Sequence, residues 1–186
     1  MCDYERARSV LTGEINLALN SVDGAQVEKL AGMICTAERV FVVGVGRVLL
    51  MLQAMVKRLN HLGIEATYVG AIDEPAITQR DLLIVGSGSG ESLFPAAISR
   101  KAKKYGARIV HIGSNPRSTV GEVADLFVRI PCRTKLNLED EIDSSQPMSS
   151  LFEQCLLILG DILACMIIES RGLDLKLLWR RHANLE

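Results

Sequence analysis

The chain has 186 residues, of which 48% are hydrophobic and 23% charged, a composition typical of a single α/β domain long enough to bury a core. A formal net charge of −1 gives no broad basic surface, which argues against nucleic acid as a partner. Five cysteines without a C-x-x-C pair favour free thiols in a reducing cytoplasm over a disulfide framework. The polar, acidic start of the chain is unlike a secretory signal.

Residues 1–37 are predicted to be helical, because apolar residues recur there at helical spacing. A turn near Ser21 to Gly24 divides this region into two helices, and Asp23 is a suitable cap for the second.

Five short apolar runs follow, and each ends in glycine or proline. They are RVFVVGVG from Arg39, EATYVG from Glu65, DLLIVGSG from Asp81, ARIVHIGS from Ala107 and LFVRIP from Leu126. Near-continuous apolar strands that alternate with helices or short connectors indicate a parallel sheet buried on both faces. We therefore predict a three-layer α/β sandwich whose five parallel strands lie within residues 38–148.

Two apolar helices are expected around this sheet. The helix that follows the first strand carries Leu49, Leu50 and Met51 beside its core face, which makes it apolar nearly all round and favours a homo-oligomer. A second long helix starts near Ser149, breaks at Gly172 and leads into a short basic end. Its apolar run is interrupted by Asp161 and is typical of a buried helix, not of a membrane span. One domain, 1–186, would then comprise N-terminal helices (1–37), a sheet core (38–148) and C-terminal helices with a tail (149–186).

Ligands of an open parallel sheet bind beyond the carboxyl ends of its strands, where three loops here are rich in glycine or serine. A G-x-G-x-x-G dinucleotide fingerprint fails in two of them, because Leu49 and Glu91 occupy the third glycine position. No Gly-Lys-Ser/Thr sequence follows any strand, which excludes a P-loop. The three histidines lie far apart without ligand spacing, so no metal site is expected.

The loop GSGSGES places Ser87, Ser89 and Ser92 at the start of a predicted helix. Glycine lets the backbone approach an anion, free N–H groups at a helix start donate to it, and hydroxyls add further donors. These features indicate a site for a phosphate monoester. The alternative is an ordinary turn in which Ser89 caps the helix.

Six segments together resemble a known family. The serine loop resembles the S-x-S-G-x-S/T loop of sugar isomerase (SIS) domains, and GVGR, RLNHLG, GSGSGES, SNPRSTVGEVAD, QPMSSLFEQ and RRHANLE occur in the order found in 6-phospho-3-hexuloisomerases. This resemblance implies reversible conversion of 3-hexulose 6-phosphate to fructose 6-phosphate by a homotetramer, without metal or cofactor. It implies that the phosphorylated sugar binds to Gly46, Arg47, Ser87, Gly88, Ser89, Ser92 and Ser114.

The same resemblance implies two catalytic residues. Glu153 matches the family's proposed base, which would carry a proton between neighbouring carbons through an enediolate. The alternative is that Ser150 and Glu153 form an S-x-x-E capping box. His182 lies in the tail, which in the family reaches a neighbouring subunit's site, and it would act there as an acid or position the sugar; the alternative is a surface histidine. Arg47 would pair with phosphate or with a carboxylate at the subunit boundary, or be simply solvated.

Three positions depart from the family pattern and leave the substrate open. Val48 replaces a serine, Ala71 follows Gly70 where a glutamate is usual, and Ser149 replaces the glycine of PMG. Two alternatives to the hexulose isomerase therefore stay open: an isomerase of another phosphorylated sugar, and a non-catalytic sugar-phosphate sensor. His61 and His111 are expected to have structural roles.

Overall fold

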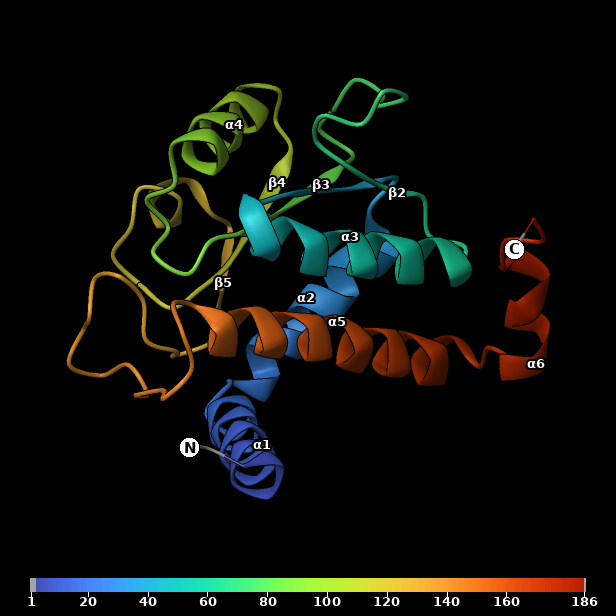
Figure 1. Cartoon of the computed structure of the whole chain (residues 1–186). Helices are drawn as coiled ribbons and strands as arrows, with labels where there is room; N and C mark the ends of the chain where they lie inside the picture. The colour runs from blue at the N-terminus through green and yellow to red at the C-terminus, as the bar shows by residue number, and fades with distance from the viewer. Residues whose placement is uncertain (1–2, 186) are drawn as a thin grey trace.

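The structure, a computed structural model, describes residues 3–185, and Cys2 lies outside this range. A five-stranded parallel sheet forms its centre (Figure 1), as the sequence predicted. The strands are β1 (Val40–Val43), β2 (Ala66–Tyr68), β3 (Leu82–Gly86), β4 (Arg108–Gly113) and β5 (Leu126–Arg129). Their order across the sheet is β2-β1-β3-β4-β5, and every neighbouring pair is parallel.

Burial on both faces explains the unbroken apolar runs of the inner strands. All residues of β1 and β3 are buried, whereas the short edge strand β2 is only half-buried. Chain order reverses between β1 and β3, which are adjacent although β2 separates them in sequence. Val43 pairs with Val85, so the loops that follow these two strands leave the sheet side by side. Such a switch point is where open α/β sheets place their ligands.

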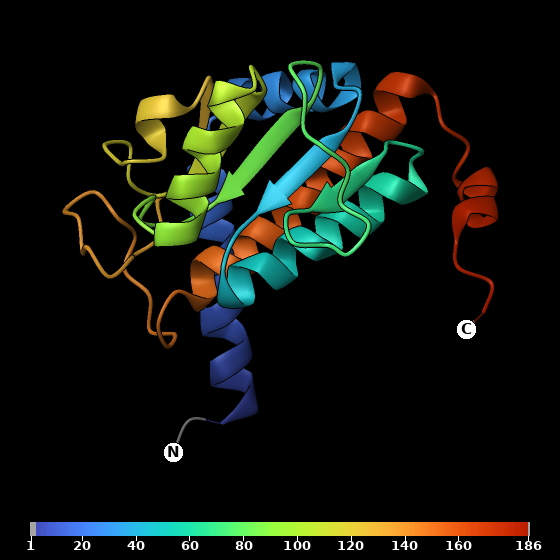
Figure 2. The ribbon, with the colours of Figure 1, turned by 90° about the horizontal axis from the view of Figure 1, so that it is seen from above.

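Helices cover the two faces unequally (Figure 2). They are α1 (Tyr4–Asn20), α2 (Gly24–Thr36), α3 (Gly46–His61), α4 (Leu93–Lys104), α5 (Ser150–Arg171) and α6 (Leu175–Leu178), with 3-10 turns η1 (Gly121–Val123) and η2 (Trp179–Arg181). Apolar side chains of α1, α2, α3 and α5 form the larger core on one face of the sheet. The other face packs mainly against α4, which completes the three layers.

The helix boundaries follow local capping signals that were visible in the sequence. Asp23 accepts a hydrogen bond from the backbone N–H of Ala25, and so begins α2 after the predicted turn. Gly172 ends α5 in the left-handed conformation with φ of 58°, as the predicted break requires.

The long helix α5 is apolar and long enough to cross a membrane by length and composition alone. It lies instead against α3 and the sheet core, with 56% of its most apolar window buried. Phe152, Leu156 and Leu163 are completely buried in that core. The burial explains why a helix so apolar belongs to the inside of the domain.

Candidate active site

A cavity of about 680 Å³ opens at the switch point between β1 and β3. The loop after β1, the loop after β3, the first turn of α5 and the connection that precedes α5 all contribute side chains to it. In Figure 1 these segments meet at the end of the molecule where α3 and α5 begin. Of the predicted site residues, Gly46, Arg47, Ser87, Gly88, Ser89, Ser92 and Glu153 line this cavity.

The serine loop, residues 86–92, forms a compact turn in front of α4. The Ser87 hydroxyl accepts a hydrogen bond from Gly90 N at 3.1 Å and lies 3.3 Å from the Ser92 hydroxyl. Ser92 is the N-cap residue of α4, yet its side chain makes no capping bond to the helix. Its hydroxyl and the free N–H groups at the helix start therefore remain suited to an anion in the cavity.

The alternative that Ser89 caps this helix is wrong. Ser92 occupies the N-cap position, and the Ser89 hydroxyl accepts only a long 3.3 Å bond from Glu91 N within the loop. The helix starts three residues later than a Ser89 cap would require, which leaves Ser89 inside the turn that lines the cavity.

Glycine is required at position 90. Gly90 has φ of +68°, and a Cβ there would lie 2.3 Å from the Ser118 hydroxyl and 2.9 Å from the His111 ring. Either the strained backbone or the collision would be enough to exclude a larger residue. The turn is thus fitted to the loop behind it and is not an idle flexible linker.

Residues behind the serine loop hold it in place. Ring nitrogen Nε2 of His111 lies 2.9 Å from the Ser87 carbonyl oxygen, and the Asn115 amide donates to the Ser89 carbonyl at 3.2 Å. Because a carbonyl only accepts, His111 donates from Nε2. Burial lowers the pKa of His111, which favours this neutral form, although the bond to Ser87 opposes the shift.

Ser114 belongs to this supporting layer and does not line the cavity. It is fully buried, and its backbone N–H donates to the Gly88 carbonyl at 2.8 Å. Its own hydroxyl has no hydrogen-bond partner among the described residues. In this structure Ser114 supports Gly88, and the substrate contact implied for it stays a prediction.

Glu153 forms the floor of the cavity together with Arg47. Glu153 is only 7% exposed. Its Oε2 lies 2.5 Å from Nε of Arg47, which lies in the first turn of α3. The two groups form an ion pair. Their geometry is not that of a hydrogen bond, because Glu153 Oε2 has no hydrogen-bond partner among the described residues. Arg47 thus pairs with a carboxylate of its own chain, a partner that the sequence analysis did not consider.

The capping-box alternative for Glu153 is wrong. Helix α5 begins at Ser150, whose hydroxyl donates to the Pro147 carbonyl, and Ser149 is the N-cap residue. The Glu153 side chain points to Arg47 and accepts a 3.4 Å bond from the Ser149 hydroxyl. A charged group placed by a buried apolar helix into a polar cavity is typical of an acid–base residue.

His182 lies at the opposite end of the molecule from this cavity. Its ring stacks on His61 at the C-terminal end of α3, with 5.3 Å between ring centroids, and it is exposed. Arg47 and His61 are fourteen positions apart on one helix, which corresponds to about 20 Å along its axis. Figure 1 shows the tail beyond the far ends of α3 and α5. The chain therefore does not bring its own His182 to Glu153.

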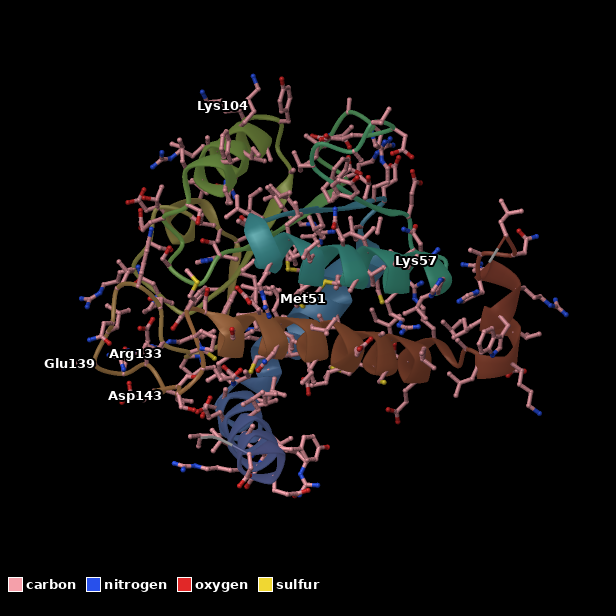
Figure 3. All side chains as sticks on the ribbon, in the orientation of Figure 1. Met51, Lys57, Lys104, Arg133, Glu139 and Asp143 are labelled. Carbon is pink, nitrogen blue, oxygen red and sulfur yellow. The ribbon has the colours of Figure 1, made fainter. Side chains whose placement is uncertain are left out.

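Sequence reasoning missed one whole wall of the cavity. Arg133, Thr134, Lys135, Ser144 and Gln146 line it from the connection between β5 and α5. Arg133 is paired with Asp143 at 2.7 Å (Figure 3). Lys135 makes no ion pair with a carboxylate anywhere in residues 3–185, so its ammonium can serve an anionic ligand. The segment TKLNLEDE has neither helix nor strand periodicity, and its charged residues are the one sequence signal that could have indicated a place in the site.

Among residues 3–185, no group of three or more histidine, cysteine, aspartate or glutamate side chains is placed to hold a metal ion.

Named relatives resemble the chain over nearly its whole length. A protein of Mycobacterium gastri called 3-hexulose-6-phosphate isomerase is 38% identical over 184 residues, which cover 99% of this chain and 92% of the relative. A protein of Bacillus subtilis (strain 168) with the same name is 35% identical over 176 residues, 95% of each chain. The chain belongs to the 3-hexulose-6-phosphate isomerase family. No protein-family model matches the sequence.

A solved structure supports this placement in the isomerase family. A protein of Methanococcus jannaschii, whose structure was taken to infer 3-hexulose-6-phosphate isomerase function, superposes with a TM-score of 0.84 at 28% identity. The match covers 97% of this chain and 99% of that one. Both the fold and the family resemblance expected from the sequence are confirmed.

The three departures from the pattern of this isomerase family have different surroundings. Val48 packs its methyl groups at the ends of β1 and β3, where a Cβ on Gly86 would lie 3.0 Å from it. Ala71 lies in a turn after β2 and does not line the cavity. Ser149 adds a hydroxyl donor to Glu153. Only Val48 and Ser149 can therefore touch a ligand in this cavity.

Proposed function

We propose that the protein interconverts 3-hexulose 6-phosphate and fructose 6-phosphate. The observation that carries the proposal is the ion-paired, nearly buried Glu153 in the same cavity as the serine loop. An isomerase of phosphorylated sugars needs a site for the phosphate, here at the start of α4, and a carboxylate in the same cavity, here Glu153. The names of the relatives point to the same reaction.

In this mechanism the serine loop holds the substrate by its phosphate. Hydroxyls of Ser87, Ser89 and Ser92 and the N–H groups at the start of α4 donate to it, and Lys135 adds a positive charge. Anchoring the phosphate fixes the position of the sugar carbons relative to Glu153, so that binding energy is used for orientation.

Glu153 then carries the proton. Its carboxylate takes the proton from C2 of the 3-ketose, which gives a 2,3-enediolate. The hydroxyl proton passes from O2 to O3, and Glu153 returns its proton to C3 as the carbonyl forms at C2. One base suffices because both carbons are adjacent. Arg47 keeps the carboxylate aimed into the cavity through the ion pair, and the burial of Glu153 limits access of water.

Replacing Glu153 by glutamine tests the assignment. Glu153→Gln keeps the size of the side chain but removes the base, so turnover should fall at least about a hundredfold, while the affinity for fructose 6-phosphate stays within a few-fold. Turnover is followed as fructose 6-phosphate formed, and affinity by calorimetry. Glu28→Gln, at an exposed position of α2 that does not line the cavity, is the control and should keep full activity.

Other outcomes would favour other functions. If the wild-type protein binds sugar phosphates but converts no hexulose 6-phosphate, the sensor function is favoured. If it converts a different phosphorylated sugar, the substrate assignment is wrong and the proposed mechanism still applies. Full activity of Glu153→Gln would remove Glu153 from the mechanism.

We also propose a homotetramer in which His182 serves the site of a neighbouring subunit. Apolar side chains on the outer faces of α3 and α5 support association: Leu50 is 56% exposed and Ile162 39% exposed. The distance between His182 and Glu153 within one chain supports a role in trans, as acid or as a positioning group for the sugar.

We place the protein in the cytoplasm. The four described cysteines, Cys35, Cys132, Cys155 and Cys165, are all free, which suits a reducing compartment.

A further inference from the structure

The cavity wall formed by residues 130–149 is a long connection with almost no regular structure. Its only sheet-like pairing within the described chain is an isolated bridge between Cys132 and Ile142. Figure 3 shows two of its charged residues, Arg133 and Asp143, on the loop beside the start of α5. A segment of this length without a helix or strand must be held by side chains, because ordering it costs conformational entropy.

Carboxylates hold this wall at several points, among them Asp140, which pairs with Arg129 of β5 at 2.7 Å. Glu141 lies within the wall and accepts hydrogen bonds from the backbone and hydroxyl of Thr134, at 3.0 and 2.9 Å, and from Leu138 N at 3.0 Å. These bonds close the outer half of the wall on itself. They do not connect it to the rest of the domain.

The inner half of the wall is connected to the domain by Glu14 of α1. Its carboxylate accepts four hydrogen bonds: from the Ser144 hydroxyl at 2.6 Å, Ser145 N at 2.8 Å, the Ser145 hydroxyl at 2.8 Å and the Gln146 amide at 3.0 Å. Two of these donors, Ser144 and Gln146, themselves line the cavity. A helix about 130 positions earlier in the chain thus fixes the inner half of the wall.

The bonds to Glu14 are strong for a half-buried group. Each is charge-assisted, because the acceptor is an ionised carboxylate. Partial burial alone raises the pKa of Glu14, but the hydrogen bonds from Ser144, Ser145 and Gln146 outweigh it and lower the pKa from 4.5 to about 2. The carboxylate therefore stays ionised, and the wall stays attached, throughout the neutral and mildly acidic range.

We propose that Glu14 is a positioning residue of the active site, which binds residues 144–146 to α1 and so holds the wall against which the substrate lies. The proposal rests on the proposed isomerase function for its predictions about KM and kcat, but not for its prediction about hydrogen exchange. Glu153 is fixed separately, by Arg47 and by the buried body of α5. Loss of Glu14 should therefore weaken substrate binding more than it slows the proton transfer.

The test compares Glu14→Ala and Glu14→Gln with Glu5→Gln. Glu5 lies on the same helix and, among residues 3–185, its ion pair is with Arg8 at the surface, so its replacement is the matched control. Glutamine keeps the length of the side chain but loses the charge. Glu14→Gln therefore keeps the test valid if Glu14→Ala does not fold. The measurements are KM and kcat for hexulose 6-phosphate, and amide hydrogen exchange without ligand.

Two results are expected. In Glu14→Ala, KM should rise about tenfold or more while kcat changes less than about threefold, and Glu14→Gln should lie between this variant and the wild type. Amides of residues 133–149 should exchange about tenfold faster without ligand, whereas amides of α3 and α5 keep the wild-type rate.

Other results would overturn the proposal. Wild-type KM in both Glu14 variants, or a loss of thermal stability with unchanged exchange in residues 133–149, would make Glu14 a purely structural residue. A wild-type protein without isomerase activity would contradict the proposed function. The role of Glu14 would still be decided by hydrogen exchange, because that measurement needs no substrate.

Discussion

His111 is a buried residue whose chemistry is tied to the serine loop. It is 0% exposed, donates to the Ser87 carbonyl from Nε2, and lies beside Phe127 with the two rings tilted and their centroids 5.0 Å apart. Its Nδ1 has no hydrogen-bond partner among the described residues. Protonation would place a charge there in an apolar setting, so the folded protein favours neutral His111.

This preference predicts an acid-sensitive stability. Because the folded-state pKa of His111 lies below the value of 6.5 found in an unfolded chain, the unfolded state binds more protons, and stability is lost as pH falls below about 6.5. The pH profile of the thermal midpoint between 5 and 8 measures it. His111→Gln should flatten the acid side of the profile. Parallel profiles for wild type and His111→Gln would contradict the assignment.

The serine loop makes a prediction at the scale of the element. Gly90→Ala forces a left-handed backbone on alanine and drives its Cβ into Ser118. We expect the free energy of unfolding to fall by about 1–3 kcal/mol and the affinity for fructose 6-phosphate to fall about tenfold or more. Chemical denaturation and calorimetry check the two effects.

A matched glycine provides the control for this variant. Gly32 lies on the exposed side of α2 with nothing within 4 Å of an added Cβ. Gly32→Ala should stabilise the fold by about 0.5–1 kcal/mol and leave the affinity unchanged. An affinity loss as large in Gly32→Ala as in Gly90→Ala would mean that the serine loop is not the phosphate site.

The elements that could be predicted from sequence are those with local signals. Strand runs such as VFVV and LLIVG, the cap at Asp23 and the break at Gly172 each depend on neighbouring residues alone. The loops after β1 and β3 could be located for the same reason. The wall of residues 130–149 could not, because its shape depends on Glu14, which is distant in sequence and has no motif. Likewise the Arg47–Glu153 pair joins two elements whose mutual position no spacing reveals.

The placement of His182 has its consequence at the scale of the whole molecule. If His182 acts in a neighbouring subunit, variants Glu153→Gln and His182→Asn should each be inactive, yet oligomers mixed from both should regain about a quarter of wild-type activity. Light scattering of the wild type establishes the oligomer, and activity after subunit exchange measures the recovery. Mixed oligomers without recovered activity would exclude the role in trans, and a monomeric wild type would exclude both proposals.

One glycine joins the three parts of the site. A Cβ on Gly88 would lie 3.2 Å from the Thr134 methyl group and 3.7 Å from the Phe152 ring, so the serine loop, the wall and the first turn of α5 touch at this residue. A displacement of any one of them is limited by the other two, because close-packed contacts transmit strain. The serine loop, the wall and the helix that carries Glu153 are therefore one packed unit, so a side chain added at Gly88 would disturb all three at once.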